Sequence, residues 1–317
     1  MNQSVQPTVS VVMITYNQEN CIAEAIKGVV KQKFDGTVEL LILDDCSTDG
    51  TGEVCREWQA RYPDVIRYVR NENNLGFQRN YMKAFGYCRG RYVALCDADD
   101  YWFYSRKLAV MVGYMDANPD CAITFHRVVN YYTATGEKSL SNGGTKADTT
   151  IADLCRSNYI TNLSVMYRRE LVDLARLPGW IAECRLPDYV MHMLYARHGR
   201  IHYFSRPMGV YRKAAGCAWS DSERFAQLNM SLAVREHLID EFSDEPDARM
   251  GLLESVAAIV NAMHGCAADD VQRDFARQKA LQYGIDISTA AAQSVPRKRL
   301  LSRVRGIVSR IVPLPRP

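Results

Sequence analysis

The chain has 317 residues, of which 47% are hydrophobic, and a formal net charge of +3. A chain of this length can bury a large core, so we expect one large domain or one domain with an appendage. No run approaches the roughly 18 consecutive apolar residues that span a bilayer, and the amino-terminal segment has neither a basic start nor an apolar stretch. We therefore expect neither a membrane-spanning protein nor a signal peptide.

Ten cysteines are scattered along the sequence without a C-x-x-C pair. Several lie inside apolar runs, where a thiol behaves as a small hydrophobic group. This distribution favours reduced thiols over disulfides or a zinc site. The expected compartment is the cytoplasm.

Apolar, strand-like runs alternate with helical patterns over the first hundred residues. Strands are predicted at 9–14, 40–43, 65–69 and 92–96, and helices at 24–30, 51–62 and 76–88. This alternation predicts a mostly parallel sheet with helices on both faces. The segment 133–148 is rich in turn residues and predicts a loop or hairpin, whereas 223–283 has a helical pattern.

Two of the predicted strands run directly into aspartates. Asp44 and Asp45 follow the second strand, and Asp97, Asp99 and Asp100 follow the fourth. The carboxyl ends of parallel strands meet at one sheet edge, where open α/β sheets bind ligands. Clustered carboxylates repel one another unless a cation or solvent relieves them, and their hard oxygens suit Mg²⁺ or Mn²⁺. The pattern predicts a site for a metal-bound nucleotide, with a solvated acidic turn as the alternative for either cluster alone.

The carboxyl-terminal segment is basic and amphipathic. After Asp286 the sequence has no acidic residue but seven arginines and lysines. Apolar residues from Leu300 to Val312 recur with helical spacing, which predicts one apolar stripe flanked by arginines. Helices of this kind typically bind to the surface of an anionic membrane. A helix packed on the protein itself and a disordered basic end are the alternatives, and nucleic acid is a weaker candidate partner.

Further motifs occur in a fixed order along the chain, at 7–17, 44–51, 74–80, 97–100 and 186–189. Together with Tyr211 and Arg212, they extend over about two thirds of the sequence. In order and spacing they resemble family 2 glycosyltransferases with the GT-A fold, of the bacterial surface-polysaccharide type. The resemblance implies an α/β fold with a Rossmann-like, mostly parallel sheet and helices on both faces, here followed by a C-terminal helical extension.

The expected domain organisation follows from this resemblance. A GT-A glycosyltransferase domain is expected over 1–222, with a nucleotide-binding half at about 1–100 and an acceptor half at about 101–222. A helical extension is expected over 223–290 and a basic amphipathic tail over 291–317.

The resemblance implies nucleotide-sugar-binding roles for residues that follow the first two strands. Thr15, Tyr16 and Asn17 would bracket the nucleobase, with Tyr16 offering an aromatic face for stacking. Asp45 would accept a hydrogen bond from the base, and Asp44 would support it or the ribose. A carboxylate can accept a hydrogen bond from an N–H group such as N3–H of uracil or thymine. This preference favours a UDP- or dTDP-sugar as the substrate.

The resemblance assigns the binding of the diphosphate and the metal to a further set of residues. Arg79 looks like the family's cationic residue near the nucleotide, where a guanidinium can contact phosphate bidentately. Asp97, Ala98 and Asp99 would reach the ribose and the metal. Asp99 and Asp100 are the candidate ligands of a divalent metal, Mn²⁺ or Mg²⁺.

One position departs from the family pattern. Many relatives carry a histidine two residues after the Tyr211-Arg212 pair, whereas this chain has Ala214. We expect either that Arg212 and Lys213 neutralise the leaving diphosphate instead, or that the metal is bound more loosely than in those relatives.

Inverting sugar transfer needs a base that takes the proton of the acceptor hydroxyl, and a carboxylate serves this role. In the family this acid begins a helix late in the domain, and Asp188, ahead of Tyr189, matches that pattern. A helix cap is the alternative role for Asp188. Glu183 is the fallback base.

The sequence thus predicts an inverting glycosyltransferase that acts on a saccharide or lipid-linked saccharide acceptor. Its expected location is cytoplasmic, or peripheral on the inner face of the plasma membrane. The main alternative is a non-catalytic carbohydrate-binding or scaffold protein with a degenerate GT-A site. A nucleotidyltransferase would need a glycine-rich, cationic loop after the first strand, and residues 15–19 contain neither glycine nor a cation. No nucleic-acid partner is expected.

Overall fold

The structure is a computed structural model that describes residues 6–141, 143–213 and 223–287. The chain divides into two compact units. The first comprises Met1–Ile151 and Tyr159–Arg212, and the second comprises Ala152–Asn158 and Lys213–Pro317. The expected domain boundaries at 222 and 290 lie outside the described residues, as does the expected tail at 291–317, so these remain predictions.

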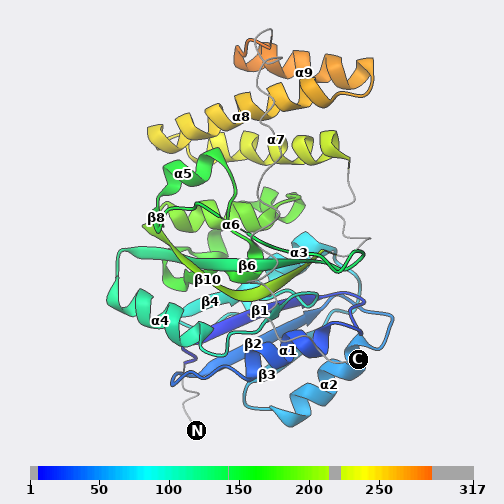
Figure 1. Cartoon of the computed structure of the whole chain (residues 1–317), viewed down its shortest axis with the longest axis vertical. Coiled ribbons are helices and arrows are strands. Elements are labelled where there is room, and N and C mark those ends of the chain that lie inside the picture. The colour runs from blue at the N-terminus through cyan, green and yellow to red at the C-terminus, as the bar shows by residue number, and fades with distance from the viewer. Residues whose placement is uncertain (1–5, 142, 214–222, 288–317) are drawn as a thin grey trace. The chain divides into compact units, whose positions relative to one another are not determined.

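A mixed sheet forms the centre of the first unit (Figure 1). Its strands are β1 Val9–Thr15, β2 Val38–Asp44, β3 Ile66–Arg70, β4 Tyr92–Leu95, β5 Tyr101–Trp102, β6 Cys121–Tyr132, β7 Lys138–Leu140, β8 Asp148–Thr149, β9 Met166–Arg168 and β10 Arg200–Lys213. Within the described residues the strand order is β3-β2-β1-β4-β9-β6-β10-β5, with β7 beside β6 and β8 beside β10.

The strands of the first hundred residues are parallel, as the sequence predicts. β1 pairs with β2 on one side and with β4 on the other, and β3 lies outside β2. The chain therefore reverses its direction of travel across the sheet between β3 and β4. Because βαβ crossovers are right-handed, this reversal places α1 Ile22–Val30 and α2 Thr51–Arg61 on one face and α3 Phe77–Gly86 on the other. The predicted α/β class with helices on both faces is confirmed.

The second half of the sheet is built from antiparallel strands. β9 pairs antiparallel with both β4 and β6, and β5 pairs antiparallel with β10. The hairpin expected near 133–148 is the β6 and β7 pair. The helical elements of this half are α4 Lys107–Ala117, η1 Asn162–Ser164, η2 Arg169–Leu171, η3 Leu174–Arg176, η4 Gly179–Glu183 and α6 Pro187–Ala196. Nearly all of α5 Ile151–Arg156 belongs to the second unit.

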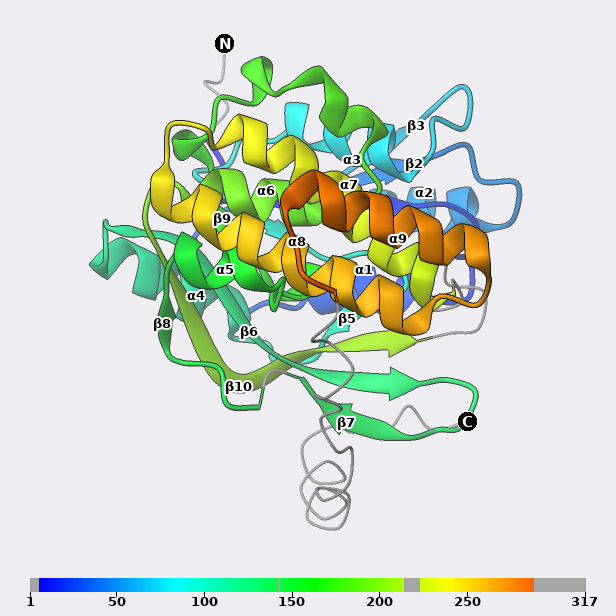
Figure 2. The same cartoon turned by 90° about the horizontal axis from the view of Figure 1, so that it is seen from above.

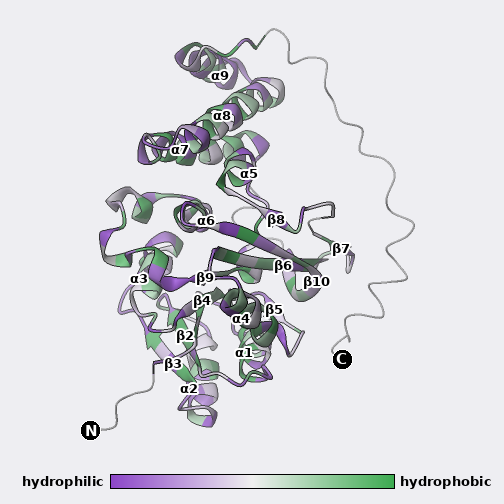
Figure 3. Ribbon diagram, turned by 90° about the vertical axis from the view of Figure 1, so that its left-hand side faces the viewer, coloured by the Kyte–Doolittle hydropathy of each residue, from purple (hydrophilic) through white to green (hydrophobic). Residues whose placement is uncertain are grey.

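The core of this unit lies between the central strands and their covering helices. The consecutive residues Val11 and Val12 are 0% and 2% exposed, and Leu40 and Leu41 are both 0% exposed. Because consecutive side chains of a strand point to opposite faces, both faces of the sheet are buried here. Hydrophobic residues, green in Figure 3, recur along α1 and α4, which cover the sheet. The rigid central strands position the loops at their carboxyl ends.

The second unit contains the C-terminal helices that the sequence predicts: α7 Arg224–Glu241, α8 Pro246–Cys266 and α9 Asp270–Tyr283. In this unit α7 packs on α8 and α8 packs on α9 (Figure 2). Asp269 caps α9 by accepting a hydrogen bond from the amide of Gln272, and Gly284, at φ 63°, ends it in the left-handed region. Among the described residues, no helix has the length and apolar character needed to cross a membrane.

Candidate active site

The loops that follow β1 and β2 are joined by hydrogen bonds into one rim of the sheet edge. Thr15 and Asp44, the last residues of these strands, lie opposite each other in the register. The amide of Asn17 donates to Ser47 Oγ at 2.9 Å, and the amide of Thr48 donates to Asn17 Oδ1 at 2.8 Å. Asn17 has a φ of 54°, a left-handed conformation that asparagine tolerates. Its side chain is therefore used to hold the rim together.

Two neighbouring residues on this rim, Thr15 and Tyr16, have side-chain groups without a partner among the described residues. Tyr16 is 46% exposed, so its ring is open to a stacking partner. The hydroxyl of Thr15 is buried and has no hydrogen-bond partner within the described part of the chain. An open aromatic face suits a planar ligand such as a nucleobase.

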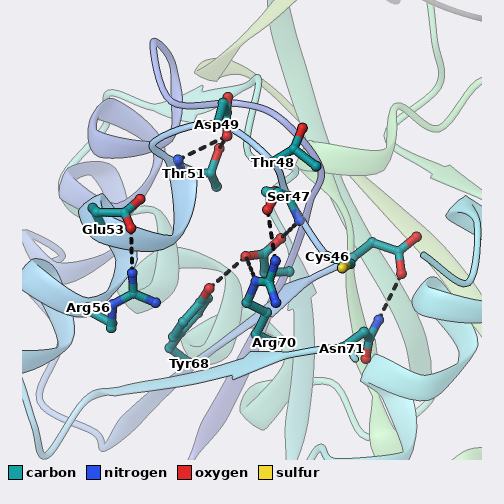
Figure 4. Close-up of polar contacts among 12 residues, drawn as sticks. Cys46, Ser47, Thr48, Asp49, Thr51, Glu53, Arg56, Tyr68, Arg70 and Asn71 are labelled. Carbon is teal, nitrogen blue, oxygen red and sulfur yellow. Dashed lines mark hydrogen bonds and ion pairs between the residues drawn. The ribbon is translucent and has the colours of Figure 1, made fainter. Parts of the chain in front are cut away.

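Asp44 is fully buried and stabilises the turn after β2. It accepts a hydrogen bond from the amide of Ser47 at 2.8 Å and one from the hydroxyl of Tyr68 at 2.6 Å. Arg70 Nε lies 3.7 Å from the same carboxylate. Figure 4 shows Ser47, Tyr68 and Arg70 gathered around this turn. Asp44 thus stabilises the rim through buried hydrogen bonds.

Asp45 anchors the loop that leads into α3. Its Oδ1 accepts hydrogen bonds from Asn71 Nδ2 and from the amide of Leu75, both at 2.8 Å, and its Oδ2 accepts one from the amide of Gly76 at 2.9 Å. Gly76 has a φ of 82°, which favours glycine at this position. Asp45 is 3% exposed. The hydrogen bond to a base that the resemblance implies would use the remaining acceptor capacity of Oδ2.

The acidic turn after β4 lies at the same sheet edge. The amide of Ala98 donates to the carbonyl of Ile14 in β1 at 3.4 Å, and Ala98 is 1% exposed, so only a small side chain fits there. Asp97 and Asp99 are partly exposed, whereas Asp100 is buried. The strand order reverses between β1 and β4, and this switch point is where doubly wound sheets bind their ligands.

The carboxyl groups of this turn have raised pKa values, because they are buried and repel one another. Burial, followed by the charge of Asp99, raises the pKa of Asp97 to about 7. Burial raises the pKa of Asp99, and burial together with the charges of Asp99 and Asp97 raises that of Asp100. A bound cation would relieve this repulsion.

The residues of the turn fit a divalent metal that shares its coordination with a substrate. Asp99 presents a partly exposed carboxylate, whereas one oxygen of Asp100 accepts a hydrogen bond from the amide of Arg212 at 2.9 Å. The described residues contain no group of three or more histidine, cysteine or acidic side chains placed to hold a metal. Mg²⁺ and Mn²⁺ commonly take one or two carboxylates and complete their shell with phosphate oxygens and water. The fit is therefore to a metal that arrives with a diphosphate.

Arg212, at the end of β10, fastens the acidic turn to α1. Its guanidinium donates to the carbonyl of Asp99 at 2.7 Å and pairs with Glu24 of α1. It also lies over the ring of Tyr101, 4.6 Å from the centroid. Its expected contact with the diphosphate stays a prediction. The residues from Ala214 onward, where the family's histidine is missing, lie outside the described range.

Asp188 lies in the first turn of α6, close enough to the acidic turn for its charge to act on Asp97. Leu186 occupies the N-cap position, so Asp188 does not occupy it. Burial raises the pKa of the Asp188 carboxyl group, and the neighbouring backbone amides of Tyr189 and Asp188 act in the opposite direction. The charge of Asp188 in turn helps to raise the pKa of Asp97.

Arg79 and Glu183 pair with each other. Arg79 of α3 donates to Glu183 at the end of η4 at 2.5 Å, and their side chains are 60% and 70% exposed. An exposed pair of this kind contributes little to stability, because solvent screens the two charges. Arg79 can therefore exchange its carboxylate partner for a phosphate at small cost.

Asn162 of η1 is a neighbour of the acidic turn that was not predicted from the sequence. Its amide donates to Asp97 Oδ2 at 2.6 Å. The indole of Trp102 holds η1 in place by donating to the carbonyl of Leu163 at 2.9 Å. Asn162 belongs to no motif in the sequence, and only the fold brings it to the acidic turn.

Comparisons with known proteins agree with this geometry. A family model described as glycosyl transferase family 2 matches residues 10–174. An uncharacterized protein of Mycobacterium tuberculosis is 34% identical over 211 residues, which cover 66% of this chain and 60% of that relative. The chain thus spans about 60% of the length of this relative.

Solved structures of similar fold include two sugar-nucleotide complexes. The structure of S. aureus TarS 1–349 with UDP-GlcNAc has a TM-score of 0.54 and 16% identity, and covers 87% of this chain and 89% of that chain. The mannosyltransferase PcManGT from Pyrobaculum calidifontis, in complex with GDP-Man and Mn²⁺, has a TM-score of 0.53 and 21% identity, with 92% and 77% covered. At these identities the likeness shows the fold.

Proposed function

Because this chain belongs to glycosyl transferase family 2, we propose that it transfers a sugar from a nucleotide-sugar donor to a hydroxyl group of a saccharide acceptor, with inversion at the anomeric carbon. The observation that supports the proposal is that the charges of Asp99 and Asp188 both act on Asp97, which follows β4 next to the point where the strand order reverses. One end of this cluster suits a diphosphate and its metal, and the other suits an incoming hydroxyl.

Asp188 is proposed as the general base. The oxygen of the acceptor hydroxyl attacks the anomeric carbon, and its proton passes to the Asp188 carboxylate. The bond from the anomeric carbon to the diphosphate oxygen breaks, and the nucleoside diphosphate leaves with the bonding electrons on the opposite face. Burial raises the pKa of Asp188, which makes its carboxylate a stronger base than that of an exposed aspartate.

The donor's nucleoside is proposed to bind at the rim formed by the β1 and β2 loops. Tyr16 offers its exposed ring to the base, and the unpartnered hydroxyl of Thr15 offers a hydrogen bond. Asn17 and Asp44 keep the rim in shape, and Asp45 has acceptor capacity for an N–H group of the base. An acceptor at this position favours uracil or thymine, and therefore a UDP- or dTDP-sugar.

The diphosphate end of the donor is proposed to meet the acidic turn and nearby cations. Asp97 would contact the ribose, and Asp99, with Asp100 beside it, would hold Mn²⁺ or Mg²⁺. The metal would neutralise charge on the departing diphosphate when bound. Arg79 and Arg212 are the cationic side chains proposed to approach the phosphates. The Mn²⁺ in the mannosyltransferase complex supports the choice of metal.

A lipid-linked saccharide is the proposed acceptor, and the support for it comes from the sequence alone. Seven cations without an acid follow Asp286, in a segment with an amphipathic apolar pattern. Basic residues near an anionic surface contribute about 1 kcal/mol each. Such a tail would hold the enzyme at the inner face of the plasma membrane. Deleting the chain after Val295 should release it from anionic vesicles and leave donor binding intact, whereas equal vesicle binding would contradict the membrane assignment.

A screen of nucleotide sugars by thermal shift tests the proposed donor site. The protein is heated with UDP-, dTDP- or GDP-sugars, with Mn²⁺ or with EDTA. A ligand at about 100 times its Kd stabilises the folded state by about 2.7 kcal/mol. We expect a pyrimidine nucleotide sugar to raise the melting temperature only with Mn²⁺. No shift with any nucleotide sugar would favour the alternative of a non-catalytic protein with a degenerate site.

A further inference from the structure

A buried pair of side-chain amides adjoins Asp45, the residue proposed to contact the nucleobase. Asn71, which directly follows β3, and Asn80 of α3 are 3% and 2% exposed. Asn71 Nδ2 donates to Asp45 Oδ1 at 2.8 Å and to Asn80 Oδ1 at 2.9 Å. Lys83 Nζ donates to Asn71 Oδ1 at 2.7 Å, and Asn80 Nδ2 donates to the carbonyl of Leu43 at 3.1 Å. Both amides therefore have a partner for their nitrogen and for their oxygen.

The direction of these hydrogen bonds is fixed at both ends of the network. An ammonium group only donates, so the atom of Asn71 that faces Lys83 is its oxygen. A backbone carbonyl only accepts, so the atom of Asn80 that faces Leu43 is its nitrogen. Turning either amide over would bring two donors or two acceptors together. Asn71 must therefore direct its Nδ2 at Asp45.

Asp45 is left with one acceptor site and no donor. Its Oδ1 accepts hydrogen bonds from Asn71 and from the amide of Leu75, and its Oδ2 accepts one from the amide of Gly76. A carboxylate has about four acceptor sites, two on each oxygen, so one remains on Oδ2. A single acceptor suits a base with one N–H group at this point. Uracil and thymine have N3–H, whereas N3 of cytosine is itself an acceptor and would be repelled.

We propose that Lys83 and Asn71 are positioning residues that make the nucleobase site selective for a base with an N–H group at N3. This inference rests on the proposed function, in which Asp45 contacts the base. Lys83 acts through Asn71 and not on the base itself. Without the ammonium group, the amide of Asn71 can turn its oxygen toward Asp45, and only a protonated carboxyl group satisfies that contact. Such a carboxyl group would donate to a base instead of accepting from it.

The test measures nucleotide selectivity in the full-length protein. The Kd values of UDP, CDP and N3-methyl-UDP are determined by calorimetry with Mn²⁺. The parent should bind UDP at least about tenfold more tightly than the other two. In Lys83→Met the ratio of the Kd values for CDP and UDP should fall about three- to tenfold, as expected for the loss of one hydrogen bond. A purely structural role of Lys83 would weaken UDP and CDP alike and leave the ratio unchanged.

Two variants serve as controls. Lys83→Arg keeps a group that only donates opposite Asn71, so it should retain the selectivity of the parent. Lys27→Met removes an exposed lysine from the last turn of α1, just as Lys83→Met removes one from the last turn of α3. It should also retain the parent ratio.

The outcomes separate this inference from the proposed function. A parent that prefers UDP, together with an unchanged ratio in Lys83→Met, would overturn the positioning role. Equal binding of UDP and N3-methyl-UDP by the parent, or no binding of UDP, would overturn the contact between Asp45 and the base, and this inference with it. Should Lys83→Met fail to fold, Lys83→Gln provides the second test. Its amide can donate or accept, so the ratio should fall in the same direction.

Discussion

Asn162 and Asp97, which are 65 positions apart in the sequence, are joined by a hydrogen bond of 2.6 Å from the Asn162 amide to the Asp97 carboxylate. This bond opposes the effect of burial and of Asp99, which together raise the pKa of Asp97. It links the acidic turn after β4 to η1, in the second half of the sheet. The proposed donor site therefore draws on both halves of the first unit.

Removing the Asn162 side-chain amide should weaken the binding of the nucleotide sugar. In Asn162→Ala the Asp97 carboxylate loses a charge-assisted hydrogen bond worth about 1.5–3 kcal/mol, so Asp97 should be less ionised near pH 7. We expect the Kd for the donor to rise about tenfold or more, measured by calorimetry with Mn²⁺. Asn130→Ala, which removes a bond to Ser139 in the β6 and β7 hairpin, is the control and should bind the donor normally.

Asp99 should account for the response to metal. Asp99→Asn keeps the shape of the turn but removes the partly exposed carboxylate, so Mn²⁺ should no longer raise the melting temperature in the presence of a nucleotide sugar. The control is Glu57→Gln, an exposed charge removal on α2. A full Mn²⁺ response in Asp99→Asn would reassign the metal to other side chains.

Glu39 should matter for stability and not for the site. It is buried near the start of β2, the end opposite to Asp44, and it accepts hydrogen bonds from Arg89 Nη2 at 2.7 Å and Nε at 3.0 Å. Glu39→Gln should lower the free energy of unfolding by about 2 kcal/mol, because a charged pair is broken next to a buried group. Urea denaturation should show a lower midpoint with an unchanged slope. Donor binding should stay at the parent level.

The fold could be predicted from the sequence wherever one strand or helix carried its own pattern. The runs that end at Thr15, Asp44 and Leu95 are apolar throughout because both sheet faces are buried, and their boundaries were predicted within a few residues. The antiparallel strands β9 and β5 were not predicted. They have three and two residues, too few to show a periodicity.

The site divides in the same way. Asp97, Asp99 and Asp188 belong to recognisable motifs, and in the structure the charges of Asp99 and Asp188 both act on Asp97. The internal roles of Asp44 and Asp45 depend on partners such as Tyr68 and Asn71, which only the folded chain brings near. Asn162 and the buried hydrogen bond between Tyr167 and His192 also depend on long-range contacts, and no local pattern marks them.

The most direct measurement of the central claim compares sugar transfer by the parent protein and Asp188→Asn, with a pyrimidine nucleotide sugar, Mn²⁺ and a saccharide acceptor. The anomeric configuration of the product is read by NMR. We predict an inverted product, and a rate that falls about 10²- to 10⁴-fold in Asp188→Asn while donor affinity is unchanged. Burial raises the pKa of Asp188, and only its ionised form accepts a proton, so the parent's rate should fall with decreasing pH at values above the usual aspartate pKa of about 3.9. Glu183→Gln should retain the parent rate. Retained configuration, or a full rate in Asp188→Asn, would contradict the account.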